Sequence, residues 1–206
     1  MPAFLLSYIQ VYYRGFTDAR TFREGNIMPD YAVLVYFDTA SEESIRILQE
    51  EASRVSGNTY MFDNRIFPHI TLSLFSKDDY QDLIEDLRVF SKRLRNIDIN
   101  LTSIGIFNST PAVVNLLPVV SKDITRIHRH LHKKLSRHEC DFNPYYEEAH
   151  WVPHCAVAVN ISSTELMPVI ETTCALFKPM VCRLSTLSLV ECNPYREVMN
   201  WKISPV

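Results

Sequence analysis

Two segments of the chain carry the same pattern, "FPHITLSLF" at 67–75 and "WVPHCAVAVNI" at 151–161. Each has a Pro-His pair followed by alternating small or hydroxyl and aliphatic residues. This repetition constrains the fold strongly, because a duplicated unit is expected to bury its apolar face against its own copy. The alternation predicts two β-strands. In the first strand, one face is expected to hold Phe67, His69, Thr71, Ser73 and Phe75, and the other Pro68, Ile70, Leu72 and Leu74.

The segments around the two Pro-His pairs repeat as well. Each half of the chain shows the order strand, helix, His-bearing strand, helix, strand, judged from periods of two and of 3.6 residues. The helix at 162–177 contains Pro168, so we expect it to kink or to begin late. The remaining predicted elements are strands at 31–38, 97–107, 111–120 and 180–192 and helices at 41–56, 78–95 and 121–138.

These elements predict an α+β fold built as a bilobal duplicated unit. Two antiparallel sheets are expected to surround a central cleft, with the helices on the outside. The lobe repeats span about 31–107 and 111–192 within a single bilobal domain at 31–206, and residues 1–30 are expected to form an N-terminal extension. A pseudo-twofold axis would bring the two His-bearing strands together at the cleft.

Composition excludes several classes of protein. The chain has 206 residues, 47% hydrophobic and 22% charged, and a formal net charge of −3. Without a basic field over the whole surface, long duplex DNA is not an expected partner. The five cysteines are odd in number and include no C-x-x-C pair, which argues against a disulfide framework and a cysteine zinc site. This cysteine usage suits a reducing environment, so we predict a cytoplasmic protein. We predict no membrane partner, because the apolar N-terminus lacks a basic start and is interrupted by Ser7 and Gln10.

Paired histidines suit the cleavage of a phosphodiester. This reaction needs a base for the attacking hydroxyl or water and an acid for the leaving oxygen. Two imidazoles with ordinary pKa values near 6.5 can hold these opposite protonation states around neutral pH. His69 and His154 are the candidates, and Thr71 lies roughly 6 to 7 Å along the strand from His69, on the same face, where its hydroxyl can donate to a phosphate oxygen.

Together, these motifs resemble those of the 2H phosphoesterase superfamily, in particular its 2′-5′ RNA ligase and cyclic phosphodiesterase branch. The resemblance covers about 31–192 and is carried by two Pro-His strands inside a duplicated unit, a more specific signal than one H-x-T tripeptide. It implies a metal-independent phosphoesterase without cofactors. Its substrates would be RNA ends with 2′,3′-cyclic phosphates, short oligonucleotides with 2′-5′ linkages, or cyclic nucleotides.

The second motif departs from the pattern of that superfamily. Ala156 stands where the superfamily has Thr or Ser, and Cys155 does not replace the hydroxyl because adjacent strand residues point to opposite faces. The loss of one donor can cost about 3 kcal/mol in the transition state. Two alternatives therefore stay open: a weakly active or noncatalytic protein that binds RNA ends or nucleotides, and a structural duplicate whose histidines are merely buried polar groups.

Other clusters give weaker signals. Phe107, Tyr145 and Trp151, and Tyr146 beside them, could stack on a base or belong to the core. His128 and His132 have the i, i+4 spacing of zinc ligands, but no third ligand is evident, so we predict no metal. The same helix is expected to present a solvated basic face with Arg126, Arg129, Lys133 and Lys134. With four glycines in the chain there is no glycine-rich phosphate loop.

Overall fold

The computed structural model describes residues 30–95 and 97–203 and has the predicted α+β class. The predicted N-terminal extension lies almost entirely outside the described residues. Among the described helices, none is long and apolar enough to span a membrane. The strands are β1 (Tyr31–Phe37), β2 (His69–Ser76), β3 (Asp98–Phe107), β4 (Ala112–Pro118), β5 (Asp141–Phe142), β6 (Cys155–Ile161), β7 (Met180–Cys192) and β8 (Tyr195–Lys202). The helices are α2 (Thr39–Ser56), α3 (Tyr60–Asp63), α4 (Leu83–Ser91), α5 (Lys122–Leu135), α6 (Ser163–Leu176) and the 3-10 helix η2 (Pro144–Tyr146).

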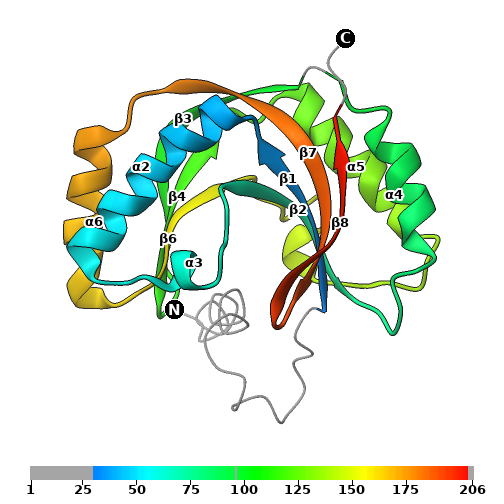
Figure 1. Cartoon of the computed structure of the whole chain (residues 1–206), viewed down its shortest axis with the longest axis horizontal. Helices are drawn as coiled ribbons and strands as arrows, with labels where there is room; N and C mark the ends of the chain where they lie inside the picture. The colour runs from blue at the N-terminus through cyan, green and yellow to red at the C-terminus, as the bar shows by residue number, and fades with distance from the viewer. Residues whose placement is uncertain (1–29, 96, 204–206) are drawn as a thin grey trace.

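The strands form one antiparallel path in the order β5-β2-β1-β7-β3-β4-β6, with β8 paired to β7. The two sheets expected from the sequence are joined through β7, the long strand that arches over the molecule in Figure 1. Residues 180–183 of β7 pair with β3, and residues 184–191 pair with β1. A single strand therefore holds the two halves in a fixed relation.

Strand pairing crosses the boundary between the two sequence repeats. The β1–β2 pair of the first repeat takes its next neighbour, β7, from the second repeat, and the β4–β6 pair of the second repeat takes β3 from the first. Helix packing crosses it too, since α2 contacts α6 and β6, while α5 contacts α4 and β2. Each half of the molecule in space is thus assembled from both repeats.

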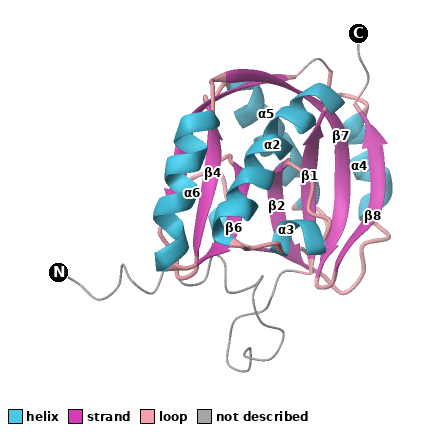
Figure 2. Cartoon of the chain, turned by 60° about the vertical axis from the view of Figure 1, so that its left-hand side comes forward, coloured by secondary structure: helices cyan, strands magenta, loops and turns pink. Residues whose placement is uncertain are grey.

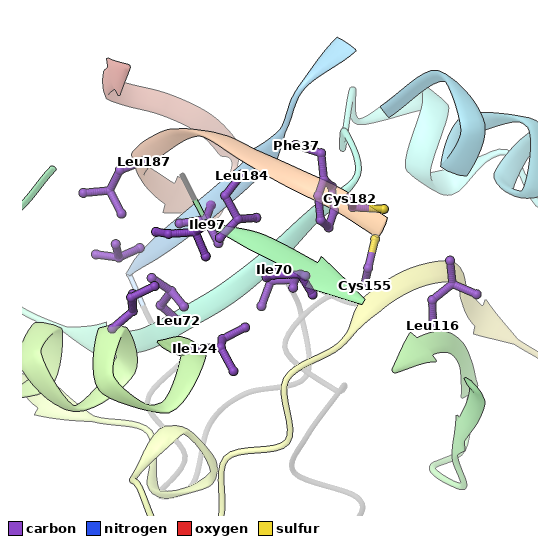
Figure 3. Packing of buried hydrophobic residues seen from close by; sticks show 14 of the residues in the cluster. Phe37, Ile70, Leu72, Ile97, Leu116, Ile124, Cys155, Cys182, Leu184 and Leu187 are labelled. Atoms are coloured by element: carbon purple, nitrogen blue, oxygen red, sulfur yellow. The ribbon is translucent and has the colours of Figure 1, made fainter. Parts of the chain in front are cut away.

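The four longest helices cover one face of this sheet, with α2 and α6 over one half and α4 and α5 over the other (Figures 1 and 2). Beneath them lies one large hydrophobic cluster that includes Val33, Leu72 and Ile124. Figure 3 shows its centre, where Cys155 and Cys182 pack among aliphatic side chains. Strand β1 is buried on both faces, because Ala32, Leu34 and Tyr36 belong to a second, smaller cluster on the opposite side. That opposite side carries the candidate site.

Capping residues explain where two helices begin. Helix α2 starts at Thr39 because the Asp38 carboxylate accepts a hydrogen bond from the Ser41 amide at 3.0 Å. Helix α6 starts at Ser163, where Ser162 and Glu165 form a capping box. Of the two alternatives expected for Pro168, a kink or a late start, the late start is wrong, because the cap fixes the first turn and Pro168 lies inside the helix.

Candidate active site

Both Pro-His pairs lie at the beginning of a strand and form the same local hydrogen bond. The His69 Nδ1–H donates to the carbonyl of Phe67 at 2.7 Å, and the His154 Nδ1–H donates to the carbonyl of Val152 at 2.7 Å. The proline between each histidine and its acceptor favours an extended conformation in the residue before it. The same two-residue hydrogen bond therefore forms in both motifs, which explains why proline precedes each histidine.

These hydrogen bonds also decide the tautomer of each imidazole. A carbonyl oxygen only accepts, so Nδ1 must carry the proton in both rings. In the neutral imidazole Nε2 is then unprotonated, and it is the atom that can gain or lose a proton. The two rings therefore present chemically equivalent nitrogen atoms.

The structure brings His69 and His154 to one cleft. Strand β6 stands at one end of the sheet path, yet it contacts β2 because the sheet curls (Figure 1). Thr71 and Ala156 line the same cleft as the two histidines. Thr71 and His154 are each only 8% exposed, so the polar groups face a confined space rather than open solvent. The other lining residues are mostly apolar and include Leu34, Ile66, Leu74, Val159 and Val190.

The predicted alternation of β2 is wrong beyond Leu72. A register shift against β1 pairs Val33 with Ser73 but Leu34 with Thr71, so β2 bulges at Leu72. The extra residue reverses the faces of the later strand residues, so that Leu74 lines the cleft and Phe75 joins the core. His69 and Thr71 precede the bulge and keep the shared face that the sequence predicted.

Burial lowers the pKa of both cleft histidines. For His154 the pKa falls from 6.5 to about 4, chiefly through desolvation, with a further lowering by the neighbouring His69. Desolvation also lowers the pKa of His69. Both imidazoles are consequently neutral at neutral pH, and a bound anion would favour their protonated forms.

At the second motif, the two residues after His154 differ in environment. Ala156 is half-buried at the cleft, and its backbone carbonyl accepts a hydrogen bond from the Gln49 amide of α2 at 3.0 Å. Cys155 is fully buried on the other face, as expected from strand geometry. Burial raises the pKa of its thiol to about 12, so Cys155 is neither a replacement donor in the cleft nor an activated nucleophile.

Of the aromatic residues proposed from the sequence for base stacking, Tyr146 lines the cleft, whereas Phe107, Tyr145 and Trp151 do not. Phe107 packs edge-on against His154, with ring centroids 4.7 Å apart. Tyr145 packs on the smaller cluster, and Trp151 contacts both clusters. Their stacking role stays a prediction.

Three tyrosines do line the cleft: Tyr60, Tyr146 and Tyr195. Sequence analysis missed Tyr60 and Tyr195, because α3 and the β7–β8 hairpin bring them there from outside both motifs. The Tyr195 hydroxyl lies 2.6 Å from the Tyr36 hydroxyl, and burial raises the pKa of Tyr195 to about 12. Both hydroxyls therefore stay protonated as hydrogen-bonding groups.

Trp151 ties the second motif to the first. Its indole N–H donates to the backbone carbonyl of Thr71 at 3.0 Å. The ring also stacks on His128 of α5, with centroids 4.0 Å apart and planes 10° apart. This contact joins the segment before His154 to the strand that carries His69 and Thr71.

We expect Trp151→Phe to lower the free energy of unfolding by about 1–2 kcal/mol, because it removes a part-buried hydrogen bond and part of a ring contact. Urea denaturation measures this loss. Trp201→Phe in β8 is the matched control, since Trp201 also packs against the large cluster. Equal losses in the two variants would show that the Thr71 contact contributes nothing specific.

Both histidines of the pair on α5 donate hydrogen bonds to backbone carbonyls and so have a structural role. The His128 Nε2–H donates to the Tyr146 carbonyl at 2.8 Å, and the His132 Nε2–H donates to the Leu72 carbonyl at 3.2 Å. Across residues 30–95 and 97–203, no group of three or more His, Cys, Asp or Glu residues is arranged to hold a metal ion. The i, i+4 spacing of His128 and His132 is explained by packing of α5 on β2 and η2.

A bilobal antiparallel sheet with two Pro-His strands facing one cleft defines the class of 2H phosphoesterases. Comparison with known proteins agrees: a sequence model of the 2′-5′ RNA ligase superfamily matches residues 37–194. The chain belongs to this superfamily. No curated protein matches the sequence.

Solved structures show the same fold at low sequence identity. Escherichia coli LigT complexed with 3′-AMP is similar over 85% of this chain and 98% of its own, with a TM-score of 0.55 and 10% identity. LigT in apo form has a TM-score of 0.54 and 14% identity, covering 84% of this chain and 96% of its own. A structure described as a phosphoesterase has a TM-score of 0.53 and 12% identity, covering 85% and 98%. The family and fold thus indicate a phosphoesterase or RNA ligase type of enzyme.

Proposed function

We propose that this protein is a metal-independent phosphoesterase that acts on RNA phosphodiesters, either 2′,3′-cyclic phosphate ends or 2′-5′ linkages. One observation carries the proposal: His69 and His154 line the same cleft, and each is held by the same Nδ1 hydrogen bond to the carbonyl two residues earlier. Two imidazoles oriented alike, with equivalent Nε2 atoms, suit an acid and a base on opposite sides of one phosphorus atom.

In hydrolysis of a cyclic phosphate, one imidazole takes a proton from water through Nε2. The water oxygen forms a bond to phosphorus, and the bond from phosphorus to one ribose oxygen breaks. The second imidazole, protonated at Nε2, gives its proton to that leaving oxygen, so the pair ends the step with exchanged protonation states. Substrate phosphate would favour the required protonated imidazole, because a nearby negative charge raises a histidine pKa.

Thr71 is proposed to orient the phosphate. It shares the cleft face with His69 and is almost fully buried, so its hydroxyl can donate to a non-bridging oxygen away from competing water. The apolar remainder of the cleft and its tyrosines suit a nucleoside beside the phosphate. The structure of LigT with 3′-AMP supports a nucleotide as the ligand of this fold.

A panel of nucleotides tests the substrate class. We expect turnover of nucleoside 2′,3′-cyclic phosphates or 2′-5′ dinucleotides and none of nucleoside 5′-monophosphates, since the latter are monoesters. Chromatography of the products identifies the bond that breaks. Cleavage of the monoester alone would contradict the proposal.

We expect kcat/KM for a cyclic phosphodiester to be highest below pH 6.5. The productive free enzyme has one imidazole protonated and the other neutral, and this form is most populated between the two pKa values. Desolvation places both below the ordinary 6.5, that of His154 at about 4. Initial rates from about pH 4 to about pH 8 measure the profile, with circular dichroism at each pH as the control for folding. An optimum at pH 7 or above would contradict this placement of the two pKa values.

A second candidate is a protein that binds RNA ends or nucleotides without turning them over. The observation that favours it is Ala156, which leaves the second motif without a hydroxyl in the cleft. Calorimetric titration with a nucleoside 3′-monophosphate, beside the activity panel, separates the candidates. Binding without turnover of any phosphodiester would favour the second.

A further inference from the structure

A second hollow in the molecule is lined by positive charge. It lies between the end of α4, residues 93–95 and 97, and helix α5. Helices α4 and α5 contact each other at the edge of the molecule (Figure 1). We call it the α4–α5 groove. Its described lining includes no acidic residue, and its buried members are the apolar Phe90, Leu94, Ile97 and Ile127. Its cations are Arg93, Arg95, Arg126, Lys133, Lys134 and Arg137.

Helix α5 supplies an ordered row of these side chains. Arg126, His130, Lys133 and Arg137 are spaced four, three and four positions apart, which places them along one face of the helix and its final turn. All four are exposed. The row extends roughly 16 Å at the helical rise per residue.

Most of this charge is not neutralised by the protein. Lys134 pairs with Asp86 at 2.9 Å, and Arg126 pairs with Asp123 at 2.6 Å. Within residues 30–95 and 97–203, no ion pair involves Arg93, Arg95, Lys133 or Arg137. In a chain with a net charge of −3, four such cations around one hollow are a local concentration of charge that favours an anion.

The α4–α5 groove is separate from the histidine cleft. Strand β1 shows this directly, since Val33 and Val35 face the large cluster under the helices, whereas Ala32 and Leu34 line the cleft on the other side of the sheet. The groove cations therefore do not touch a phosphate held by His69 and His154. They form a second surface, apart from the histidine cleft.

We propose that the α4–α5 groove binds the phosphodiester backbone of single-stranded RNA. The choice of RNA rests on the function proposed above. Its backbone offers one negative charge per nucleotide, matching a row of cations, and three unpaired arginines provide planar forks for phosphate oxygens. Because the lining has no exposed aromatic platform, we expect backbone contacts without base preference. A hollow also fits a strand better than the flat surface of a lipid bilayer.

The test uses fluorescence anisotropy with a 5′-labelled RNA of about twelve nucleotides that ends in a 3′-hydroxyl. The variant Arg93→Gln/Lys133→Gln removes two groove cations. Its matched control, Arg54→Gln/Lys178→Gln, removes one arginine and one lysine from exposed positions away from the groove. At about 50 mM salt we expect the groove variant to bind on the order of tenfold more weakly than wild type. Its slope of log affinity against log salt should shrink by about 1.4, since each single-strand contact contributes about 0.7.

Equal affinity and equal salt slope in the groove variant and the control would overturn the inference. The inference would also be overturned, in favour of a lipid surface, if the wild type bound phosphatidylserine vesicles more strongly than RNA and the groove variant lost this vesicle binding. Turnover of a mononucleoside 2′,3′-cyclic phosphate separates this inference from the proposed function. We expect the groove variant to keep that activity. If the wild type binds RNA but turns over no phosphodiester, the proposed function is refuted and the inference about the groove still stands.

Discussion

Replacing His69 or His154 by alanine is expected to lower kcat for a 2′,3′-cyclic phosphate by a factor of about 10² to 10⁴, the usual contribution of a positioned acid or base. Each substitution removes the imidazole that its Pro-His motif contributes to the lining of the cleft. Because each histidine performs one of two proton transfers in the same step, the double variant should lose little more than either single variant. Steady-state kinetics at the optimal pH of the wild type measures these losses.

His150→Ala is the control for this experiment. His150 is exposed, precedes the second motif by a few residues and does not line the cleft. We therefore expect the His150→Ala variant to keep the kcat of the wild type. Thermal unfolding of all variants separates a loss of chemistry from a loss of folding. If His69→Ala and His154→Ala remain folded and retain kcat, the two-histidine mechanism is refuted.

The second large effect is expected from Ala156→Thr. Restoring a hydroxyl at this position provides a second donor to the phosphate, opposite Thr71, where charge develops in the transition state. Removing one such donor from an enzyme costs about 10² in kcat. We expect the gain here to be about tenfold or more. The room for the side chain exists, since Ala156 is only half-buried and lines the cleft.

Ala156→Val separates the hydroxyl from the added volume. Valine has the shape of threonine without the donor, so kcat should stay at or below that of the wild type. If valine and threonine raise kcat equally, the effect comes from packing of β6 and not from phosphate binding. If neither variant changes kcat, Ala156 is no longer an explanation for weak catalysis.

Much of the fold can be predicted from sequence periodicity. The seven apolar-rich residues of β1 and the alternation of β3 and β7 predict strands, and Ser121 with the apolar stripe after it predicts α5. Periodicity does not predict which strands, distant in the sequence, pair with each other. The sequence of residues 180–192 does not predict that one end of β7 pairs with β3 and the other with β1. This pairing depends on how both repeats pack together.

Some features of the candidate site can also be predicted from the sequence, and others cannot. The Pro-His pairs identify His69 and His154, because their local hydrogen bonds depend on neighbours two residues away. The bulge at Leu72 has no sequence signature, since it arises from the register against β1. Tyr195 enters the cleft through a hairpin that belongs to neither motif. The basic face expected on α5 is divided by tertiary pairing, with Arg129 bound to Glu148 and Lys134 to Asp86, so that only part of it remains available to an anion.

The central claim is that His69 and His154 carry out both proton transfers of phosphodiester cleavage in this cleft without a metal ion. Phosphorus NMR of the wild-type protein with a nucleoside 2′,3′-cyclic phosphate in excess EDTA tests it most directly, because the cyclic diester and the monoester product give separate signals. We predict steady conversion of the diester to a single monoester at the same rate with and without the chelator. A diester signal that persists unchanged in both conditions, or conversion that stops when EDTA is added, would contradict the claim.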